Sequence, residues 1–574
     1  MRSLGMRHGF AAAMLLGVCG GGLGAAQVGR DALEHRWLYL ATNLLVDKNV
    51  DANIALLERA ARAGYNGVLV ADSKFLRWDI LPDRYITNVR RFREACRRLG
   101  LRCIAAVCPI GYSNDLLSRD PHLAEGLPVR DAPFLAQDNA LVPADPSLRL
   151  VNGGFEQWRG HTPAGWSFVD EPGRVSFRDD QVKFEGHSSL RMEQIGARSP
   201  YANGRACQTL AVVPWRYYHV SVAVKTRDFE AAGQVRINVL GKDGQTLNFY
   251  EPRVEKTQDW RRIHATFNSL ENREVNFYVG VWGGRGGTIW WDDVRIEPAG
   301  FVNVVRRDGA PLRVTSEDGK TQFTEKKDFA EVRDPKLGND PYPGQYSVWH
   351  DLPAVRLLPQ SRIREGQKVL ASYYHTAIIH SDQVMCCMAE PKVYDILRWH
   401  LAEVHKNLQP DGYFLSHDEI RVQGWDASCQ NSGKTPAQLL ADNVRRCVEL
   451  IRAEDPGKPI FVWSDMFDPF HNARPKGKYY LVRGDGPWHG SWEGLPPEVI
   501  VMNWNSNPKV RRDSLRHFAQ RGHAQMLAGY YDGPVGAIRE WLADARSAGH
   551  VVGVMYTTWR HNYQDLEAFA KAAW

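Results

Sequence analysis

Short apolar runs that alternate with amphipathic helical patterns constrain this 574-residue chain most strongly. Near the N-terminus, Trp37–Thr42, Gly67–Asp72 and Leu101–Val107 have the composition of buried strands, and residues 53–63 and 85–99 between them have helical spacing. Strands that alternate with helices over short connections pair in parallel. The N-terminal part therefore predicts an α/β fold, either a barrel or a doubly wound sheet.

The same alternation returns in the C-terminal third, where helical patterns at 391–408 and 436–451 separate further apolar runs. These runs are residues 368–374, 412–416, 459–465, 498–504, 523–531 and 550–559. The total is nine candidate strands, one more than a (β/α)8 (TIM-like) barrel needs. We predict such a barrel, with either 368–374 or 37–42 outside the closed sheet.

An all-β segment interrupts the barrel pattern. Helical periodicity is lost from about residue 146, and segments such as 217–225 and 275–281 alternate polar and apolar residues between Gly-rich turns. The predicted domains are a barrel N-terminal part at 27–145, a β-sandwich at 146–299, connecting hairpins at 300–367 and a barrel C-terminal part at 368–574.

Residues 1–26 are typical of a secretory signal peptide. Arg2 and Arg7 precede the apolar stretch Phe10–Val18, and Gly24-Ala25-Ala26 supplies small residues for cleavage. We expect a secreted or periplasmic protein without a transmembrane segment, and anchoring as a lipoprotein through Cys19 is the less favoured alternative.

Charge and cysteine content narrow the partners. The 72 basic and 66 acidic residues are interspersed, so nucleic acid is not an expected partner. Eight cysteines remain after the signal, and Cys386 or Cys387 could form a disulfide with Cys429 or stay a buried thiol. No cysteine spacing matches a zinc site, and we predict no metal site and no required cofactor.

The stretch Gly412–Glu419 carries the strongest functional signal. An apolar strand, GYFLS, ends directly in His417, Asp418 and Glu419. Buried carboxylates are costly unless they are paired or used, and strand ends line the active site of a barrel. Asp418 and Glu419 are therefore the candidate catalytic residues; the alternative is that backbone N–H groups or an Arg neutralise them.

Polar and aromatic residues at the other strand ends complete a candidate substrate-binding set. The set consists of His417, Asp72, His375, Trp463, Asp465, Trp504, Tyr531, Asp532, Tyr556 and Trp559. Carboxylates among Trp and Tyr rings suit the hydrolysis of glycosides, in which acids protonate the leaving oxygen and rings hold the sugar face. No nucleophile elbow, phosphate-binding loop or dinucleotide fingerprint is present.

The sandwich resembles the jelly-roll carbohydrate-binding modules that accompany glycoside hydrolases. The resemblance rests on residues 151–156, Gly165-Trp166, residues 186–190 and Ile289-Trp290-Trp291-Asp292-Asp293-Val294. It implies a glycan or polysaccharide as partner and allows a structural calcium ion in the module.

The C-terminal third resembles the barrel β-N-acetylhexosaminidases in four short motifs. These are His417-Asp418-Glu419, Val462-Trp463-Ser464-Asp465, Asn503-Trp504 and Tyr556-Thr557-Thr558-Trp559. The resemblance implies an exo-acting hydrolase of N-acetylhexosamine-containing glycans that works by substrate-assisted retention. In it, Asp418 orients the 2-acetamido group and Glu419 is the acid/base.

The chain departs from that family at Ser416-His417, where the family has a Gly pair, and this departure changes the predicted pocket floor. Two alternatives therefore stay open. One is a retaining glycosidase of non-acetylated sugars with Asp465 as nucleophile, and the other is a non-catalytic polysaccharide-binding protein.

Overall fold

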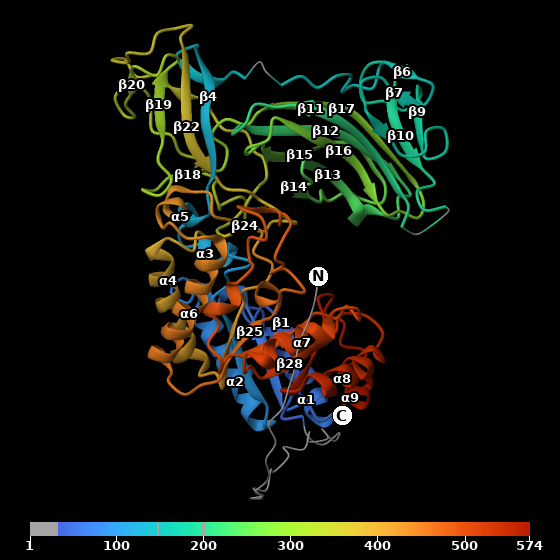
Figure 1. The fold of residues 1–574 in the computed structure, drawn as a ribbon, viewed down its shortest axis with the longest axis vertical. Coiled ribbons are helices and arrows are strands. Elements are labelled where there is room, and N and C mark those ends of the chain that lie inside the picture. Colours follow the sequence, from blue (N-terminus) through green and yellow to red (C-terminus); the bar gives the residue numbers. More distant parts are fainter. Residues whose placement is uncertain (1–32, 146–147, 198, 200) are drawn as a thin grey trace, which may run out of the picture.

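The computed structural model describes residues 33–145, 148–197, 199 and 201–574, so the expected signal peptide and Cys19 lie outside the described residues. The chain forms three parts: a barrel and, side by side at one end of it, a smaller antiparallel sheet and a β-sandwich (Figure 1).

Eight parallel strands form a closed barrel, which confirms the predicted (β/α)8 class. The order in the sheet follows the sequence: β1 (His35–Ala41), β2 (Gly67–Ala71), β3 (Arg102–Val107), β23 (Gly412–Leu415), β25 (Ile460–Trp463), β27 (Ile500–Asn503), β28 (Gln525–Tyr530) and β29 (Val551–Thr557). Pairing of β1 with β29 closes the sheet. The first candidate strand therefore belongs to the barrel.

Helices surround the barrel, namely α1 (Asp47–Arg62), α2 (Asp83–Arg98), α4 (Pro391–Leu408), α6 (Pro436–Glu454), α7 (Arg511–Gln520), α8 (Ala537–Ala548) and α9 (Leu566–Ala573). Helix α6 begins at a reciprocal capping box formed by Thr435 and Gln438, with Pro436 in its first turn. Within the described part of the chain, no helix combines the length and apolar character needed to cross a bilayer.

A cluster of buried, mostly large side chains fills the barrel interior. Trp37 packs edge-on against Phe461 with the ring centroids 4.7 Å apart, and Leu69, Ile104 and Phe414 surround them. Gly67 on the neighbouring strand leaves the space for this indole, because a Cβ at that position would lie 2.4 Å from Trp37 Nε1.

The antiparallel sheet contains segments that the sequence assigns to the barrel. Its strands are β4 (Leu127–Gln137), β5 (Ala140–Pro143), β18 (Val304–Val305), β19 (Arg313–Ser316), β20 (Gln322–Phe323), β21 (Val355–Arg356) and β22 (Lys368–His375). The ninth candidate strand is thus β22, outside the barrel. Its side chains alternate between buried and half-buried, whereas barrel strand β23 is buried throughout, because this sheet covers a core on one face only.

The sandwich consists of two five-stranded sheets, ordered β15-β12-β17-β10-β9 and β14-β13-β16-β11-β8. Their bounds are β8 (Phe168–Val169), β9 (Ser176–Asp179), β10 (Ser189–Glu193), β11 (Asn203–Ala211), β12 (Tyr217–Arg227), β13 (Val235–Gly241), β14 (Thr246–Tyr250), β15 (Gln258–Asn268), β16 (Glu274–Trp282) and β17 (Thr288–Pro298). The all-β insert is therefore confirmed.

The sandwich contacts the loop after barrel strand β25 and the segment that follows β22. Gln245 donates a hydrogen bond to the Tyr480 carbonyl at 3.1 Å, and the His380 N–H donates one to the Phe249 carbonyl at 2.9 Å. The Phe249 and Tyr480 rings lie 5.8 Å apart. The module is thus held beside one end of the barrel (Figure 1).

We expect Gly67→Ala to lower the free energy of unfolding by about 1–3 kcal/mol, because the new methyl group overlaps Trp37 in a filled interior. Urea denaturation of both proteins measures the change. Gly233→Ala, at a position with open space around it, is the control and should leave stability within about 0.5 kcal/mol of wild type. Equal losses in the two variants would contradict this account of the barrel core.

Candidate functional site

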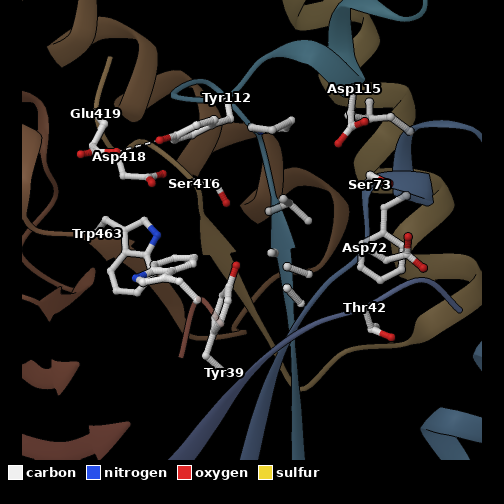
Figure 2. Close-up of a pocket in the computed structure, with 18 of the residues that line it drawn as sticks. Tyr39, Thr42, Asp72, Ser73, Tyr112, Asp115, Ser416, Asp418, Glu419 and Trp463 are labelled. Carbon is white, nitrogen blue, oxygen red and sulfur yellow. Dashed lines mark hydrogen bonds between the residues drawn. The ribbon is translucent and has the colours of Figure 1, made fainter. Parts of the chain in front are cut away.

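A cavity of ≈ 760 Å³ opens at the carboxyl ends of the barrel strands (Figure 2). Seven of the predicted site residues line it: Asp72, Asp418, Glu419, Trp463, Trp504, Tyr531 and Trp559. This is the position at which barrels carry their active sites. The cavity is large enough for a small ligand such as a monosaccharide or disaccharide.

The loop after β3 fixes the position of Asp418. The backbone N–H groups of Ile110 and Gly111 both donate to the Ser416 carbonyl, at 3.0 and 3.1 Å. Gly111 lies so close to the Asp418 backbone that a Cβ would be 1.7 Å from its carbonyl oxygen. Glycine is therefore required at 111 for the two strand-end loops to meet in this way.

Glu419 is held at both its backbone and its carboxylate. Its φ of 49° lies in the left-handed region, and its N–H donates to Asp465 Oδ2 at 2.9 Å. Tyr112 donates to Glu419 Oε2 at 2.7 Å, and Arg421 forms an ion pair with Oε1 at 2.8 Å. A strained backbone held by several partners is common at functional sites.

Arg421 and Tyr112 are functional-site residues that the sequence reasoning missed. The Arg421 side chain is 4% exposed and donates to Gln383 Oε1 at 2.5 Å. Gln383 in turn donates to the carbonyls of Gly111 and Glu419. A charged residue inside the apolar run Ile420-Arg421-Val422 was the available signal for Arg421, but nothing in the sequence links Tyr112 to this motif.

The Asp418 carboxyl, unlike that of Glu419, has no ion-pair partner among the described residues and lies among other carboxylates. Burial, together with the neighbouring charges of Asp465 and Glu419, raises its pKa to about 8. At neutral pH this carboxyl therefore carries a proton, beside a Glu419 that is paired with Arg421.

Asp465 supports the site from behind and does not line the cavity. It is fully buried and accepts hydrogen bonds from the Glu419 N–H, from Trp504 Nε1 at 3.1 Å and from Asn472 at 2.9 Å. Burial raises its pKa to about 6. Its contacts are those of a residue that positions Glu419 and Trp504.

Aromatic rings form one wall of the cavity. Trp559 lies 5.1 Å from Tyr39 and 6.3 Å from Trp463 between ring centroids, and Trp504 stacks on Tyr531 at 5.9 Å with an interplanar angle of 9°. Trp559 is 48% exposed, so its face is free to contact a ligand. Tyr39 was not predicted as a site residue, although it also lies on a barrel strand.

Asp532 and Tyr556 lie behind this wall. Asp532 accepts hydrogen bonds from the Thr558 hydroxyl at 2.5 Å and the Trp559 N–H at 2.9 Å, so it fixes the loop that carries Trp559. Tyr556 is fully buried and donates to the Asn562 carbonyl. Neither residue lines the cavity, in contrast to the sequence prediction.

The predictions for His417 and His375 are wrong. His417 is fully buried, and its Nε2 is bonded to Asn443 of α6 at 2.8 Å, so the cavity is reached by its neighbours Ser416 and Asp418 but not by His417 itself. His375 is outside the barrel, on β22, where it stacks on Tyr217 at 3.5 Å and bonds to Asn268. Both side chains satisfy structural contacts.

Asp72 lines the end of the cavity away from the carboxylate pair (Figure 2). It accepts hydrogen bonds from the backbone N–H groups of Leu44 at 2.8 Å and Lys74 at 3.0 Å. Its main structural role is therefore to cap the N-terminus of the short helix Ser73–Leu76.

Comparisons with known proteins place the sandwich in a family. Residues 149–286 match the family described as "Carbohydrate binding domain", so the chain carries a carbohydrate-binding module of that family. A comparison with curated proteins gives no match. The family match covers less than half of the chain and leaves the barrel unassigned.

Several solved structures are similar to parts of the chain. A module solved with β-1,4-galactotriose is 16% identical and covers 26% of this chain and 97% of its own, with a TM-score of 0.21. A xylan-binding domain from Paenibacillus barcinonensis is 16% identical over 25% and 91%, with a TM-score of 0.19. A chitobiase from Flavobacterium johnsoniae is 17% identical over 35% and 32%, with a TM-score of 0.26.

Asp418→Asn should raise the melting temperature at pH 8 by about 1–3 °C and flatten its pH dependence. The folded-state pKa of Asp418 is raised to about 8, so between about pH 4 and 8 the folded chain binds a proton that the unfolded chain releases. Wild-type stability therefore falls as the pH rises through this window, and Asn removes that loss.

Thermal melts from pH 4 to 9 measure the effect, with Asp51→Asn on the exposed face of α1 as control. A wild-type curve and an Asp418→Asn curve that stay parallel across this range would contradict the raised pKa.

Proposed function

We propose that the protein is a glycoside hydrolase, in which Asp418 and Glu419 act on a sugar bound against the aromatic wall. The observation that carries the proposal is the shared cavity: two adjacent carboxyl groups at a barrel strand end face Trp463, Trp504 and Trp559. Rings hold the apolar face of a pyranose, and paired carboxyls supply the proton transfer and charge stabilisation that glycosidic cleavage needs.

The attached module supports the same proposal. A carbohydrate-binding family matches residues 149–286, and the module packs on the loop next to the catalytic pair. Tyr480, which accepts from the module, also lies under the Arg421 guanidinium at 5.2 Å. A glycan bound to the module would therefore be kept near the cavity. Export of the enzyme remains a prediction from residues 1–26.

The resemblance to β-N-acetylhexosaminidases supplies the finer proposal. Glu419 protonates the leaving oxygen and then deprotonates water, while Asp418 stabilises the 2-acetamido group of an N-acetylhexosamine at the end of a glycan. The contacts of Arg421 and Tyr112 fix the direction of the Glu419 carboxylate. Ser416 lines the cavity next to this pair, so the floor differs from a Gly pair by one hydroxymethyl group.

The protonation pattern favours a second assignment within the same pair. The Asp418 carboxyl carries a proton at neutral pH, and Glu419 is ion-paired. In this assignment Asp418 is the proton donor, and Glu419 stabilises the positive charge that develops on the sugar. Neither assignment uses Asp465 as a nucleophile. Its oxygens accept hydrogen bonds from Glu419, Trp504 and Asn472, so they are not directed at a bound sugar.

Glu419→Gln should lower kcat on any cleaved glycoside by about 10²–10⁴-fold, because it removes the carboxylate but keeps the shape. A panel of chromogenic glycosides, N-acetylated and plain, measures the loss beside wild type. Glu540→Gln on the exposed side of α8 is the control and should keep full activity.

If Glu419→Gln turns over substrate as fast as wild type, the proposed catalytic role of Glu419 is wrong. Cleavage of plain hexosides only would remove the N-acetylhexosamine assignment and keep the hydrolase. Absence of turnover in all proteins, with retained binding of a polysaccharide, would favour the non-catalytic binding protein.

Substrates with good and poor leaving groups separate the two assignments. A variant that lacks the proton donor should lose about 10²-fold or more on an alkyl glycoside and much less on a dinitrophenyl glycoside, because the latter leaves without protonation. If Glu419 is the donor, Glu419→Gln shows this split. If Asp418 is the donor, Asp418→Asn shows the larger loss on the alkyl glycoside. A variant that loses equally on both substrates shows that the replaced residue is not the donor.

A further inference from the structure

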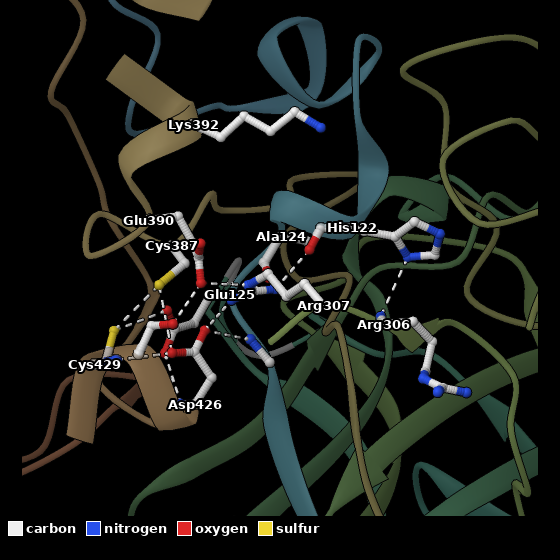
Figure 3. A network of polar contacts seen from close by, with 12 residues as sticks. His122, Ala124, Glu125, Arg306, Arg307, Cys387, Glu390, Lys392, Asp426 and Cys429 are labelled. Carbon is white, nitrogen blue, oxygen red and sulfur yellow. Dashed lines mark hydrogen bonds and ion pairs between the residues drawn. The ribbon is translucent and has the colours of Figure 1, made fainter. Parts of the chain in front are cut away.

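Four buried side chains outside the cavity converge on one point: Glu125, Cys387, Asp426 and Cys429 (Figure 3). Their potential ligand atoms all lie within 4.8 Å of one another, and each residue is at most 1% exposed. They come from three distant segments of the chain. The function proposed above uses none of them.

We propose that these four residues form a structural zinc site. Two cysteine sulfurs with two carboxylate oxygens are a ligand set suited to Zn²⁺, which takes four such ligands in tetrahedral geometry. Binding of Zn²⁺ forms two Zn–S and two Zn–O bonds and releases to solvent the two thiol protons, together with the Glu125 proton when that carboxyl is protonated. No electron transfer is involved.

The distances between ligand atoms fit a tetrahedron. The two sulfurs are 3.4 Å apart, Cys387 Sγ is 3.4 Å from Asp426 Oδ1, and Cys429 Sγ is 3.3 Å from Glu125 Oε2. Zn–S bonds near 2.3 Å and Zn–O bonds near 2.1 Å place neighbouring ligand atoms about 3.5–3.8 Å apart. Small side-chain movements are therefore enough to enclose the ion.

Each carboxylate presents one oxygen to the sulfurs and has the other held by the protein. Glu125 Oε1 accepts the Trp425 N–H at 2.7 Å, which leaves Oε2 facing Cys429. Asp426 Oδ2 is paired with Arg307, which leaves Oδ1 facing Cys387. Such outer contacts orient metal ligands in known zinc sites.

Gln423 adds a third outer contact. Its amide nitrogen lies 3.0 Å from Cys429 Sγ and 3.1 Å from Glu125 Oε2, as an N–H donor to a metal-bound sulfur would. Its amide oxygen is buried and has no hydrogen-bond partner within the described structure. The amide is thus oriented by the cluster alone.

The carboxylates in and beside the cluster outnumber the positive charges that face them, which favours binding of a cation. Glu390 lies beside it and shares Arg307 with Asp426, so one guanidinium faces two carboxylates, with Glu125 close by. Buried carboxylates without matching positive charge are costly. A divalent ion supplies that charge.

The site would tie together the two points where the chain leaves the barrel and returns to it. The Glu125 N–H donates to the Met385 carbonyl, so the outgoing and returning segments are already adjacent, and Asp426 and Cys429 belong to α5 (Ala427–Asn431) and its cap. Helix α5 follows the short strand β24 (Val422–Gln423), which adjoins Arg421. The ion would therefore brace the loop that carries Glu419.

Two metal-free arrangements compete with this proposal. In one, burial keeps the cluster protonated: it raises the pKa of Glu125 to about 8 and the pKa of the Cys387 thiol well above its usual value. In the other, thiol–disulfide exchange with an oxidised partner in the compartment to which the protein is exported joins Cys387 to Cys429 in a disulfide. The experiment distinguishes all three.

The full-length protein is purified without chelators, and its zinc content and free thiols are measured by mass spectrometry. We expect about one zinc per chain. Replacement by Co²⁺ should give the intense visible bands of a tetrahedral cobalt–thiolate site. Cys387→Ser/Cys429→Ser should lose the metal, and Cys96→Ser/Cys103→Ser, a buried pair elsewhere, should keep it.

Two further measurements do not depend on the folding of the double variant. Gln423→Leu should weaken zinc affinity by about 10–100-fold, as the loss of an outer contact does. Chelation of reduced wild type should lower its melting temperature, and Zn²⁺ but not Ca²⁺ should restore it. No stoichiometric zinc in protein with free thiols, or a mass lower by two hydrogens from a Cys387–Cys429 disulfide, would overturn the proposal.

Discussion

The close approach of Gly111 to the Asp418 backbone is the constraint on which the site depends. Two N–H groups of the 110–111 loop hold the Ser416 carbonyl, so the chain must turn immediately after β23. That turn places Asp418 and Glu419 on the cavity side and sends His417 into the helix layer. One contact between consecutive barrel strands, β3 and β23, therefore decides which of three adjacent polar residues meet a ligand.

The sequence predicted the barrel well because its strands are buried on both faces and appear as continuous apolar runs. It could not place the ninth run, Lys368–Tyr374, since composition alone does not distinguish a barrel strand from one that covers a core on a single face. The sandwich was evident from its period-two segments. The small antiparallel sheet was hidden because the paired residues of β4 and β22 are at least 233 positions apart (Lys368 with Leu135), and long-range pairing leaves no local pattern.

The candidate site was predicted in part. Strand ends pointed to Asp418, Glu419 and three Trp residues, because parallel strands deliver their carboxyl ends to a common face. The same rule failed for His375, whose strand is not in the barrel, and it could not separate lining from supporting residues such as Asp465. Tyr112 and Gln383 come from loops, where position depends on tertiary contacts. The structural calcium in the sandwich stays a prediction.

An insertion between the third and fourth barrel strands creates a mechanical problem that the structure answers locally. More than 260 residues separate Glu125, on the way out, from Cys387, on the way back. Motion of the module would be transmitted to β23 unless the two crossings were fixed to each other. Three contacts next to α5 fix the two crossings to each other: the backbone β-bridge between Ala124 and Cys386, the hydrogen bonds of Arg307, and the Glu125 cluster. Under the proposed function, a glycan held by the module would therefore not disturb the geometry of Glu419.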